Sequence, residues 1–329
     1  MNSVESREVG PAESGMRLDR WFRVHFPDLG HGRLQKLLRT GQVRIDGSRV
    51  RANARLEAGQ VVRVPPLGES GAPRERAPRA ISDKDAAWVR NMVVYKDDDL
   101  LVLDKPSGLA VQGGTSTERH LDGLLDALVL DGGERPRLIH RLDRDTSGVI
   151  ALARTRAAAT ELGRAFKTHD VRKVYWALVT GVPRPARGTI DVALVKAGKD
   201  GDQRVRPAGE EEEGGQGAVT HYATIAVAGT RVAWLALLPV TGRTHQLRAH
   251  LAAIGHPIVS DGKYGSRDSH PGAEIDRRLH LHARSLSLPR PGGGTLTVEA
   301  PLPEHMARTW AFFGFDAQEA GDPFAELAL

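Results

Sequence analysis

Apolar side chains recur at helical spacing near the start of the 329-residue chain. Residues 18–25 follow this spacing, and residues 34–38 resume it after a break at 27–32 that contains proline and glycine. The pattern predicts two short amphipathic helices. Residues 1–15 are polar and show no periodicity, so we expect them to form a disordered leader.

The pattern changes to alternation after the second predicted helix. Apolar and polar residues alternate over 43–45 as far as Asp46-Gly47, a dipeptide that favours a tight hairpin because it tolerates positive φ. An apolar run at 61–64 predicts the last strand of a small sheet. Residues 16–66 are therefore expected to form a helix-helix-β module.

A second domain is expected beyond residues 67–90, which begin with a proline- and glycine-rich stretch typical of a linker. Short apolar segments then alternate with loops, which predicts an α+β domain over 91–315 with a large mixed, mainly antiparallel sheet, followed by a tail at 316–329. Strands are expected at 92–95, 100–103, 149–153, 174–179, 232–238 and 279–288, and helices at 156–168, 244–254 and 304–313.

One interruption of that domain is polar. Residues 196–218 are rich in glycine, arginine and acidic side chains, including the run Glu210–Glu213. We expect a surface loop that buries nothing.

Several classes of protein are excluded by composition. The longest apolar stretch, residues 232–240, is far shorter than the roughly 20 residues that a membrane-spanning helix needs. The chain has no cysteine, which excludes disulfides and thiolate zinc sites, and its first thirty residues contain no apolar signal segment. We expect a cytoplasmic protein without structural metal.

Positive charge is concentrated near the N-terminus. Residues 16–66 hold 11 Lys+Arg and 4 Asp+Glu, and Arg outnumbers Lys 37 to 9 over the chain. Because the planar guanidinium suits phosphate, the module is expected to bind nucleic acid. Codon usage that inflates arginine is the alternative explanation.

The densest polar cluster is HRLDRDTSG, residues 140–148, which lies between apolar segments and is centred on Asp143. Two acids and two arginines ahead of Thr-Ser-Gly favour a turn that projects a carboxylate from a sheet edge. A salt-bridged surface loop is the alternative for this segment taken alone.

Two further segments carry complementary side chains. Residues 172–178 alternate as a strand, so Tyr175 shares a face with Lys173. Residues 241–265 open a helix on which Arg248 lies beside an apolar face, where its guanidinium can approach a carboxylate. His245 and His250 in this segment are five residues apart, which does not match a zinc pair on one helical face.

These three segments, in this order, resemble the motifs of the RluA-type pseudouridine synthase family. The matching stretches are HRLDRDTSG with Asp143, RKVYWALVTG with Tyr175, and GRTHQLRAHLAAIGHPIVSDGKYG with Arg248. The stretch DKPSG at residues 104–108 resembles the segment that precedes them in that family. The likeness runs from about residue 91 to residue 303.

The resemblance implies an isomerase that breaks the N1–C1′ bond of uridine, turns the uracil and rejoins it through C5. It implies that Asp143 is the catalytic carboxylate, that a nearby Arg248 keeps it ionised, and that Tyr175 stacks on the base and can transfer a proton at C5. Further substrate contacts are implied for Arg141, which would fill the gap left by the extruded uridine, and for His140 and Leu247.

No cofactor is expected, because the reaction has no redox step and the sequence has no dinucleotide fingerprint or phosphate-binding loop. Residues 16–66 are similar to the S-four-like RNA-binding domain, and this pairing resembles the branch that acts on large-subunit ribosomal RNA. The expected partner is that RNA or its precursor, bound by a monomer. Phosphate contacts are expected from four basic side chains: Arg17, Arg33, Lys36 and Arg44.

Two alternatives to this function stay open. One is a catalytically idle RNA-binding or ribosome-assembly factor with the same fold. The other is a pseudouridine synthase directed at transfer RNA.

Overall fold

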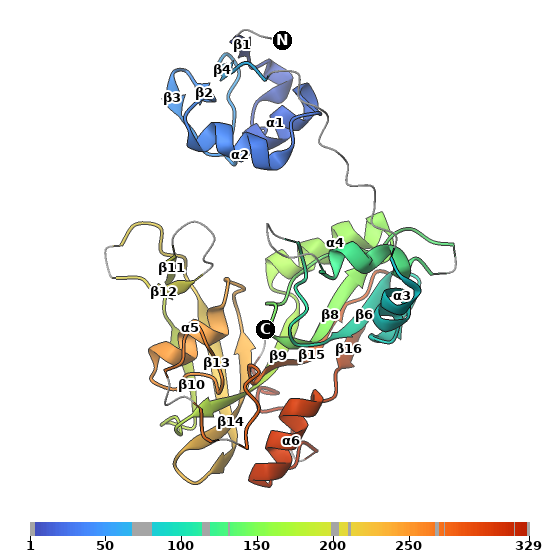
Figure 1. Ribbon diagram of the computed structural model, residues 1–329, viewed down its shortest axis with the longest axis vertical. Coiled ribbons are helices and arrows are strands. Elements are labelled where there is room, and N and C mark those ends of the chain that lie inside the picture. Colours follow the sequence, from blue (N-terminus) through green and yellow to red (C-terminus); the bar gives the residue numbers. More distant parts are fainter. Residues whose placement is uncertain are drawn as a thin grey trace. The chain divides into compact units, whose positions relative to one another are not determined.

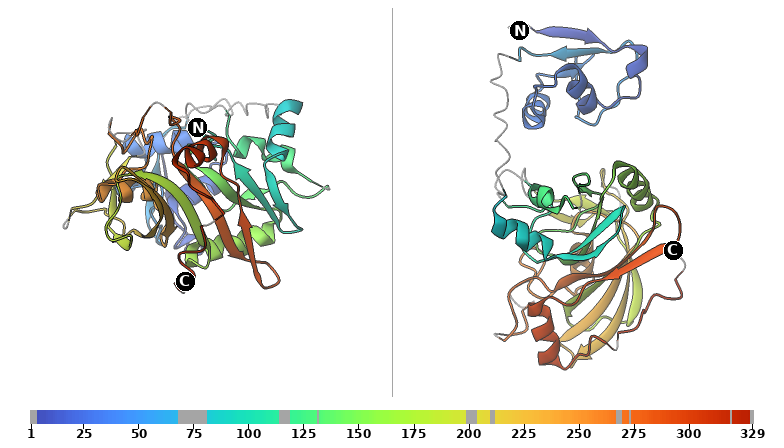
Figure 2. Two further views of the ribbon diagram at one scale, coloured as in Figure 1. Left: turned by 90° about the horizontal axis from the view of Figure 1, so that it is seen from below. Right: turned by 90° about the vertical axis from the view of Figure 1, so that its right-hand side faces the viewer.

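The computed structural model divides into two compact units, Met1–Ala80 and Ile81–Leu329. It describes residues 4–67, 81–113, 119–130, 132–198, 204–209, 212–266, 270–272, 274–318 and 320–327. Figures 1 and 2 show the helices and strands of each unit. Of the predicted linker, residues 68–80 lie outside the described part of the chain, as do Glu210 and Glu211 of the acidic run.

The smaller unit packs two helices against one face of a small sheet (Figure 2). The predicted helices and the hairpin at Asp46-Gly47 are confirmed. The core holds the apolar side chains of both helices, including Trp21 and Phe22, and those of the strands. The elements are β1 (Glu5–Glu8), α1 (Leu18–His25), α2 (His31–Arg39), β2 (Arg44–Ile45), β3 (Ser48–Arg49) and β4 (Val61–Val64), and the sheet order is β1-β4-β2-β3.

The prediction of a disordered leader is wrong. Residues Glu5–Glu8 form β1, which pairs antiparallel with β4, and a 3-10 turn η1 follows at Pro11–Glu13. Glu13 accepts a hydrogen bond from Trp21 Nε1 at 3.1 Å and contacts His25 Nε2 at 2.5 Å. Backbone pairing with β4 orders this segment, so its side chains need no apolar periodicity.

The larger unit is an α+β domain around a ten-stranded sheet, which confirms the predicted fold class. Eight strands follow the order β10-β13-β14-β9-β15-β8-β6-β5, with β16 paired to β15 and β7 paired to β8. Among the described pairs only β15 and β8 are parallel. The bounds are β5 (Val93–Lys96), β6 (Leu100–Lys105), β7 (Arg137–Leu138), β8 (Ser147–Ala153), β9 (Arg172–Thr180), β10 (Arg187–Asp191), β13 (Val219–Ala228), β14 (Val232–Pro239), β15 (Leu281–Pro289) and β16 (Thr295–Glu299).

Helices cover both faces of each half of this sheet (Figure 1). On β6 and β8, the helices α3 (Asp83–Arg90) and η2 (Asp122–Leu128) pack on one face and α4 (Arg156–Thr168) on the other. On β9 and β14, α5 (Gln246–Ala253) covers the face of Ala177 and Val179, while α6 (Glu304–Phe313) covers the face of Trp176 and Leu178. The predicted alternation along β9 is therefore confirmed.

Two predicted boundaries and one predicted loop are wrong. The second half of the predicted linker folds as α3 within the larger unit, because Val89 joins the core beside β6. The predicted tail contributes Phe324, which is buried against α6. The segment expected to bury nothing contains β12 (Val205–Pro207), which pairs with β11 (Leu194–Lys196) and packs Val205 against Ala249 of α5.

Within the described residues, no helix combines the length and the apolar character needed to span a bilayer.

Candidate active site

A cavity of about 610 Å³ lies between the loop before β8, the end of α4, strand β9 and the start of α5. It gathers side chains that are far apart in the sequence. All six site residues predicted for the larger unit line this cavity: Asp143, Tyr175, Arg248, Arg141, His140 and Leu247.

Asp143 sits in the turn between β7 and β8. Its carbonyl accepts a hydrogen bond from the Thr146 N–H at 3.2 Å, and its side chain is 22% exposed. The turn ends at Gly148, whose φ is +107°. A Cβ at this position would lie 2.2 Å from the Ala283 carbonyl oxygen, so the close approach of β8 to β15 requires glycine.

The end of β6 and the residues that follow it hold the Asp143 turn in place. Lys105 is fully buried, and its Nζ donates to the carbonyl of Arg144 at 3.1 Å and to that of Leu109 at 2.8 Å. Ser107 Oγ donates to the Asp145 carbonyl at 2.8 Å. Burial lowers the pKa of Lys105 to about 7, against the opposing effect of nearby carboxylates. Side chains of the DKPSG stretch therefore hold the turn in place through hydrogen bonds to the turn's backbone carbonyls.

Tyr175 points from β9 into the cavity, as the alternation along that strand predicts. Burial, and secondarily the Asp143 carboxylate, raises the pKa of Tyr175 above its ordinary value. The phenol therefore keeps its proton at neutral pH. It offers an aromatic ring and a hydroxyl group to the cavity that Asp143 also lines.

Arg248 does not make the expected pair with Asp143. It binds Asp261 instead, with Nε at 2.7 Å and Nη2 at 2.6 Å from the two carboxylate oxygens. Asp261 is buried and also accepts hydrogen bonds from the backbone N–H groups of Lys263 and Tyr264. Its fixed, desolvated carboxylate is the better partner for a bidentate guanidinium. The contact that the structure records for the Asp143 carboxylate is His245 Nε2, at 3.9 Å.

His140 links the loop before β8 to that strand. Its Nε2 accepts a hydrogen bond from the Ala151 N–H at 2.8 Å, and its ring stacks on Phe166 with 4.4 Å between centroids. Burial, followed by the Lys173 charge, lowers the pKa of His140 to about 3. The ring is therefore neutral. The neighbouring Arg141 side chain is exposed at the cavity, whereas Leu247 is buried at its wall.

The four predicted RNA-binding side chains lie on the smaller unit. Lys36 is exposed on α2. Arg17 is half-exposed and bound to Asp19 at 2.6 Å, and Arg44 donates to the carbonyls of Gly41 and Gly47. Arg33 contacts the Leu67 carbonyl. Their role in RNA binding stays a prediction.

Three residues at or behind the site were missed by the sequence interpretation: Lys105, His245 and Asp261. Each lies in one of the motifs quoted above. The motifs therefore indicated the right segments, but they did not single out these three side chains. No cluster of three or more His, Cys, Asp or Glu side chains suited to a metal occurs among the described residues.

Comparison with known proteins connects this site to one family. A family model described as RNA pseudouridylate synthase matches residues 99–253. Ribosomal large subunit pseudouridine synthase C of Vibrio cholerae is 35% identical over 318 residues, which cover 93% of this chain and 97% of that protein. The chain belongs to the RNA pseudouridylate synthase family.

Other members of the RNA pseudouridylate synthase family support the assignment. The protein of the same name from Escherichia coli K12 is 34% identical, with 93% of this chain and 95% of that protein covered. The solved structure of human RNA Pseudouridylate Synthase Domain Containing 4 is 29% identical, with a TM-score of 0.59, and covers 70% of this chain and 95% of that one. The predicted family resemblance is confirmed. The likeness of residues 16–66 to the S-four-like domain stays a prediction.

Proposed function

We propose that this pseudouridine synthase isomerises specific uridines of large-subunit ribosomal RNA, with Asp143 as the catalytic carboxylate. The observation that carries the proposal is the position of Asp143, which a braced turn presents to a cavity beside Tyr175. The relatives named as ribosomal large subunit enzymes match nearly full length, which supports the ribosomal substrate.

The reaction breaks the N1–C1′ bond, forms a C5–C1′ bond, releases the C5 hydrogen as a proton and leaves a proton on N1. Asp143 acts either as the nucleophile or as the base at C2′. In this proposal Tyr175 stacks on the extruded uracil and takes part in the transfer of the C5 proton. Arg141 is exposed at the cavity mouth and fills the space that the base leaves in the RNA.

The arginine acts differently from the sequence expectation. Because Arg248 is bound to Asp261, it supplies a partly neutralised positive charge near Asp143 rather than a direct ion pair. His140 has its Nε2 occupied by the Ala151 N–H and supports the turn. Leu247 provides an apolar wall for the base.

The experiment that tests this function replaces Asp143→Asn, which removes the charge and keeps the shape. We expect tritium release from RNA carrying 5-tritiated uridine to be abolished while RNA binding persists. Retained turnover in the purified variant would contradict the role of Asp143. Wild-type protein that binds RNA and releases no tritium would instead indicate a catalytically idle assembly factor.

The substrate is distinguished by mapping pseudouridines in cells that lack the protein. Loss of sites in large-subunit ribosomal RNA supports the proposal, whereas loss confined to transfer RNA supports the transfer-RNA-directed alternative. In the proposed function the protein acts as a cytoplasmic monomer and needs no cofactor, and its basic smaller unit supplies phosphate contacts through Arg17, Arg33, Lys36 and Arg44.

A further inference from the structure

The Asp143 carboxylate needs a donor that Arg248 does not supply directly. The structure places His245 Nε2 at 3.9 Å from Asp143 Oδ2, and both side chains line the cavity. We propose that His245 is a positioning residue whose Nε2–H donates to the Asp143 carboxylate and holds this anion toward the extruded base. The inference rests on the proposed function of Asp143.

A chain of hydrogen bonds favours one tautomer of His245. The Val205 N–H donates to the Tyr264 hydroxyl at 3.0 Å, and the same hydroxyl lies 3.0 Å from His245 Nδ1. A backbone N–H can only donate, so the hydroxyl accepts from Val205. In the proposed arrangement the hydroxyl directs its own proton at Nδ1. In a neutral ring the proton is then on Nε2, the nitrogen that faces Asp143.

The surroundings keep the ring neutral. Burial lowers the pKa of His245, and the charges of Arg248 and Lys263 lower it further, while Asp143 and Asp261 oppose them. A neutral donor stabilises the carboxylate without transferring a proton to it.

The backbone aims the side chain. His245 has φ 51° and ψ 22°, a left-handed conformation that is unusual for a residue with a Cβ, and it immediately precedes α5. Its ring is buried and meets the Tyr264 ring edge-on, with 5.7 Å between centroids. The next side chain, Gln246, accepts from the Arg243 N–H and donates to the Val219 carbonyl, which fixes the turn. Strained conformations that are held this firmly cluster at functional sites.

The separation of 3.9 Å is longer than a hydrogen bond. Catalytic hydrogen bonds commonly shorten when substrate binds, and a shift of about 1 Å by the Asp143 side chain closes this one. We expect the contact to form when the uracil occupies the cavity.

The test compares His245→Leu, which has no donor, with His245→Gln, whose amide can donate from nearly the same place. Tyr264→Phe removes the hydroxyl that favours this tautomer. We expect the single-turnover rate of tritium release to fall about 10- to 100-fold in His245→Leu and less than about tenfold in His245→Gln, with RNA affinity unchanged in both. Adding Tyr264→Phe to His245→Leu should cause no further loss, because the two residues act in one chain.

Three outcomes would overturn the proposal: wild-type rates in His245→Leu, equal losses in the leucine and glutamine variants, or additive losses in the double variant. Thermal melting of each variant confirms that it folds. If His245→Leu does not fold, the tritium-release rates of Tyr264→Phe and His245→Gln are compared with that of the wild type instead.

A measurement that does not depend on turnover separates this proposal from the proposed function. Nitrogen NMR of histidine-labelled full-length protein reports the tautomer of His245, with its signals assigned from the His245→Gln variant. We expect a proton on Nε2 in the wild type and a shifted equilibrium in Tyr264→Phe. A proton on Nδ1 would overturn the proposal even if the enzyme is active, whereas an inactive wild type with the expected tautomer would count against the proposed function alone.

Discussion

The Asp261 carboxylate determines what Arg248 can do. Both side chains are buried, and the guanidinium makes two short hydrogen bonds to Asp261. The sequence places both residues in one motif, but nothing in residue spacing shows that the guanidinium turns toward Asp261 rather than toward Asp143. Side-chain pairing of this kind depends on how the loop at 260–264 returns to α5.

This pair predicts a large loss of stability in Asp261→Asn. The substitution leaves the buried Arg248 charge without a full partner, so we expect the free energy of unfolding to fall by about 3 to 5 kcal/mol in urea titration. The control is Asp126→Asn, which removes an exposed pair with Arg135 and should cost less than about 1 kcal/mol. Equal losses in the two variants would show that the Arg248 pair is not energetically special.

At the scale of elements, the regular segments with strong periodicity were predicted well from the sequence. The helices α4 and α6 begin and end where the pattern places them, because their apolar faces pack on the sheet. The predicted strands did not include β7, β10, β11, β13 and β16, nor the strands β1 and β12, whose segments were expected to be a disordered leader and a surface loop. The strands β1 and β12 are short and without an apolar alternation, held by backbone pairing with β4 and β11, which no local pattern records.

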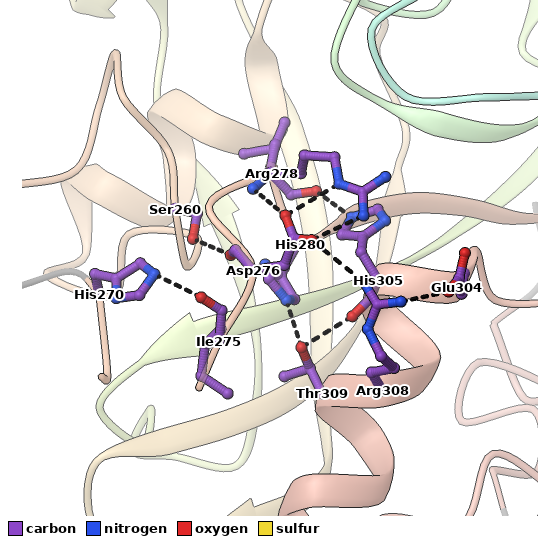
Figure 3. Close-up of polar contacts among 11 residues, drawn as sticks. Ser260, His270, Ile275, Asp276, Arg278, His280, Glu304, His305, Arg308 and Thr309 are labelled. Carbon is purple, nitrogen blue, oxygen red and sulfur yellow. Dashed lines mark hydrogen bonds and ion pairs between the residues drawn. The ribbon is translucent and has the colours of Figure 1, made fainter. Parts of the chain in front are cut away.

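The start of β15 and the start of α6 share buried histidines that no motif suggested (Figure 3). His280, just before β15, contacts Thr309 of α6 at 2.9 Å, and His305 of α6 donates through Nε2 to the Leu279 carbonyl. Within β15, His282 lies 2.9 Å from Ser147 Oγ at the start of β8. Burial lowers the pKa of His280 and of His282 to about 4 each.

These histidines predict a loss of stability in mild acid. Between about pH 6.5 and pH 4 the unfolded chain takes up a proton on each ring that the folded protein excludes, so the contribution is complete above pH 6.5 and is lost as pH falls through this window. We expect a decline of roughly 3 kcal/mol for each ring, measured as the free energy of unfolding against pH.

A matched pair of variants checks this assignment. His280→Gln should flatten the pH dependence, and the matched His282→Gln, at the other buried ring, should flatten it by a similar amount. An unaltered slope in His280→Gln would contradict the role of His280. Asp276 is a separate contributor: hydrogen bonds from Arg278 hold its pKa well below the usual range, so its stabilising effect is lost at a lower pH than that of the histidines.

At the scale of the whole molecule, the chain contains a basic unit and a unit that holds the cavity. Deleting residues 1–80 removes the first unit and leaves α3 in place. We expect the truncated protein to bind RNA at least about tenfold more weakly than the full chain at salt concentrations between 50 and 200 mM. Its affinity should also depend less steeply on salt, while the thermal transition of the remaining unit is retained. Affinity that is equal to the wild type at every salt concentration would contradict this division of roles.

A finer control tests a single phosphate contact. Lys36→Ala on the exposed side of α2 should lower affinity alike for all RNA sequences and reduce the salt slope by about one. A sequence-dependent loss would indicate that Lys36 reads bases instead.

The pairing of β1 with β4 has a practical consequence for anyone who wishes to produce the basic unit by itself. A fragment that starts at Met16, where apolar periodicity begins, would lack both the edge strand and the Glu13 acceptor of Trp21. Without β1, the backbone N–H and C=O groups along the edge of β4 would be unpaired and able to pair with a strand of another chain. We therefore expect such a fragment to self-associate. A fragment that keeps Glu5 onward retains its own covering strand.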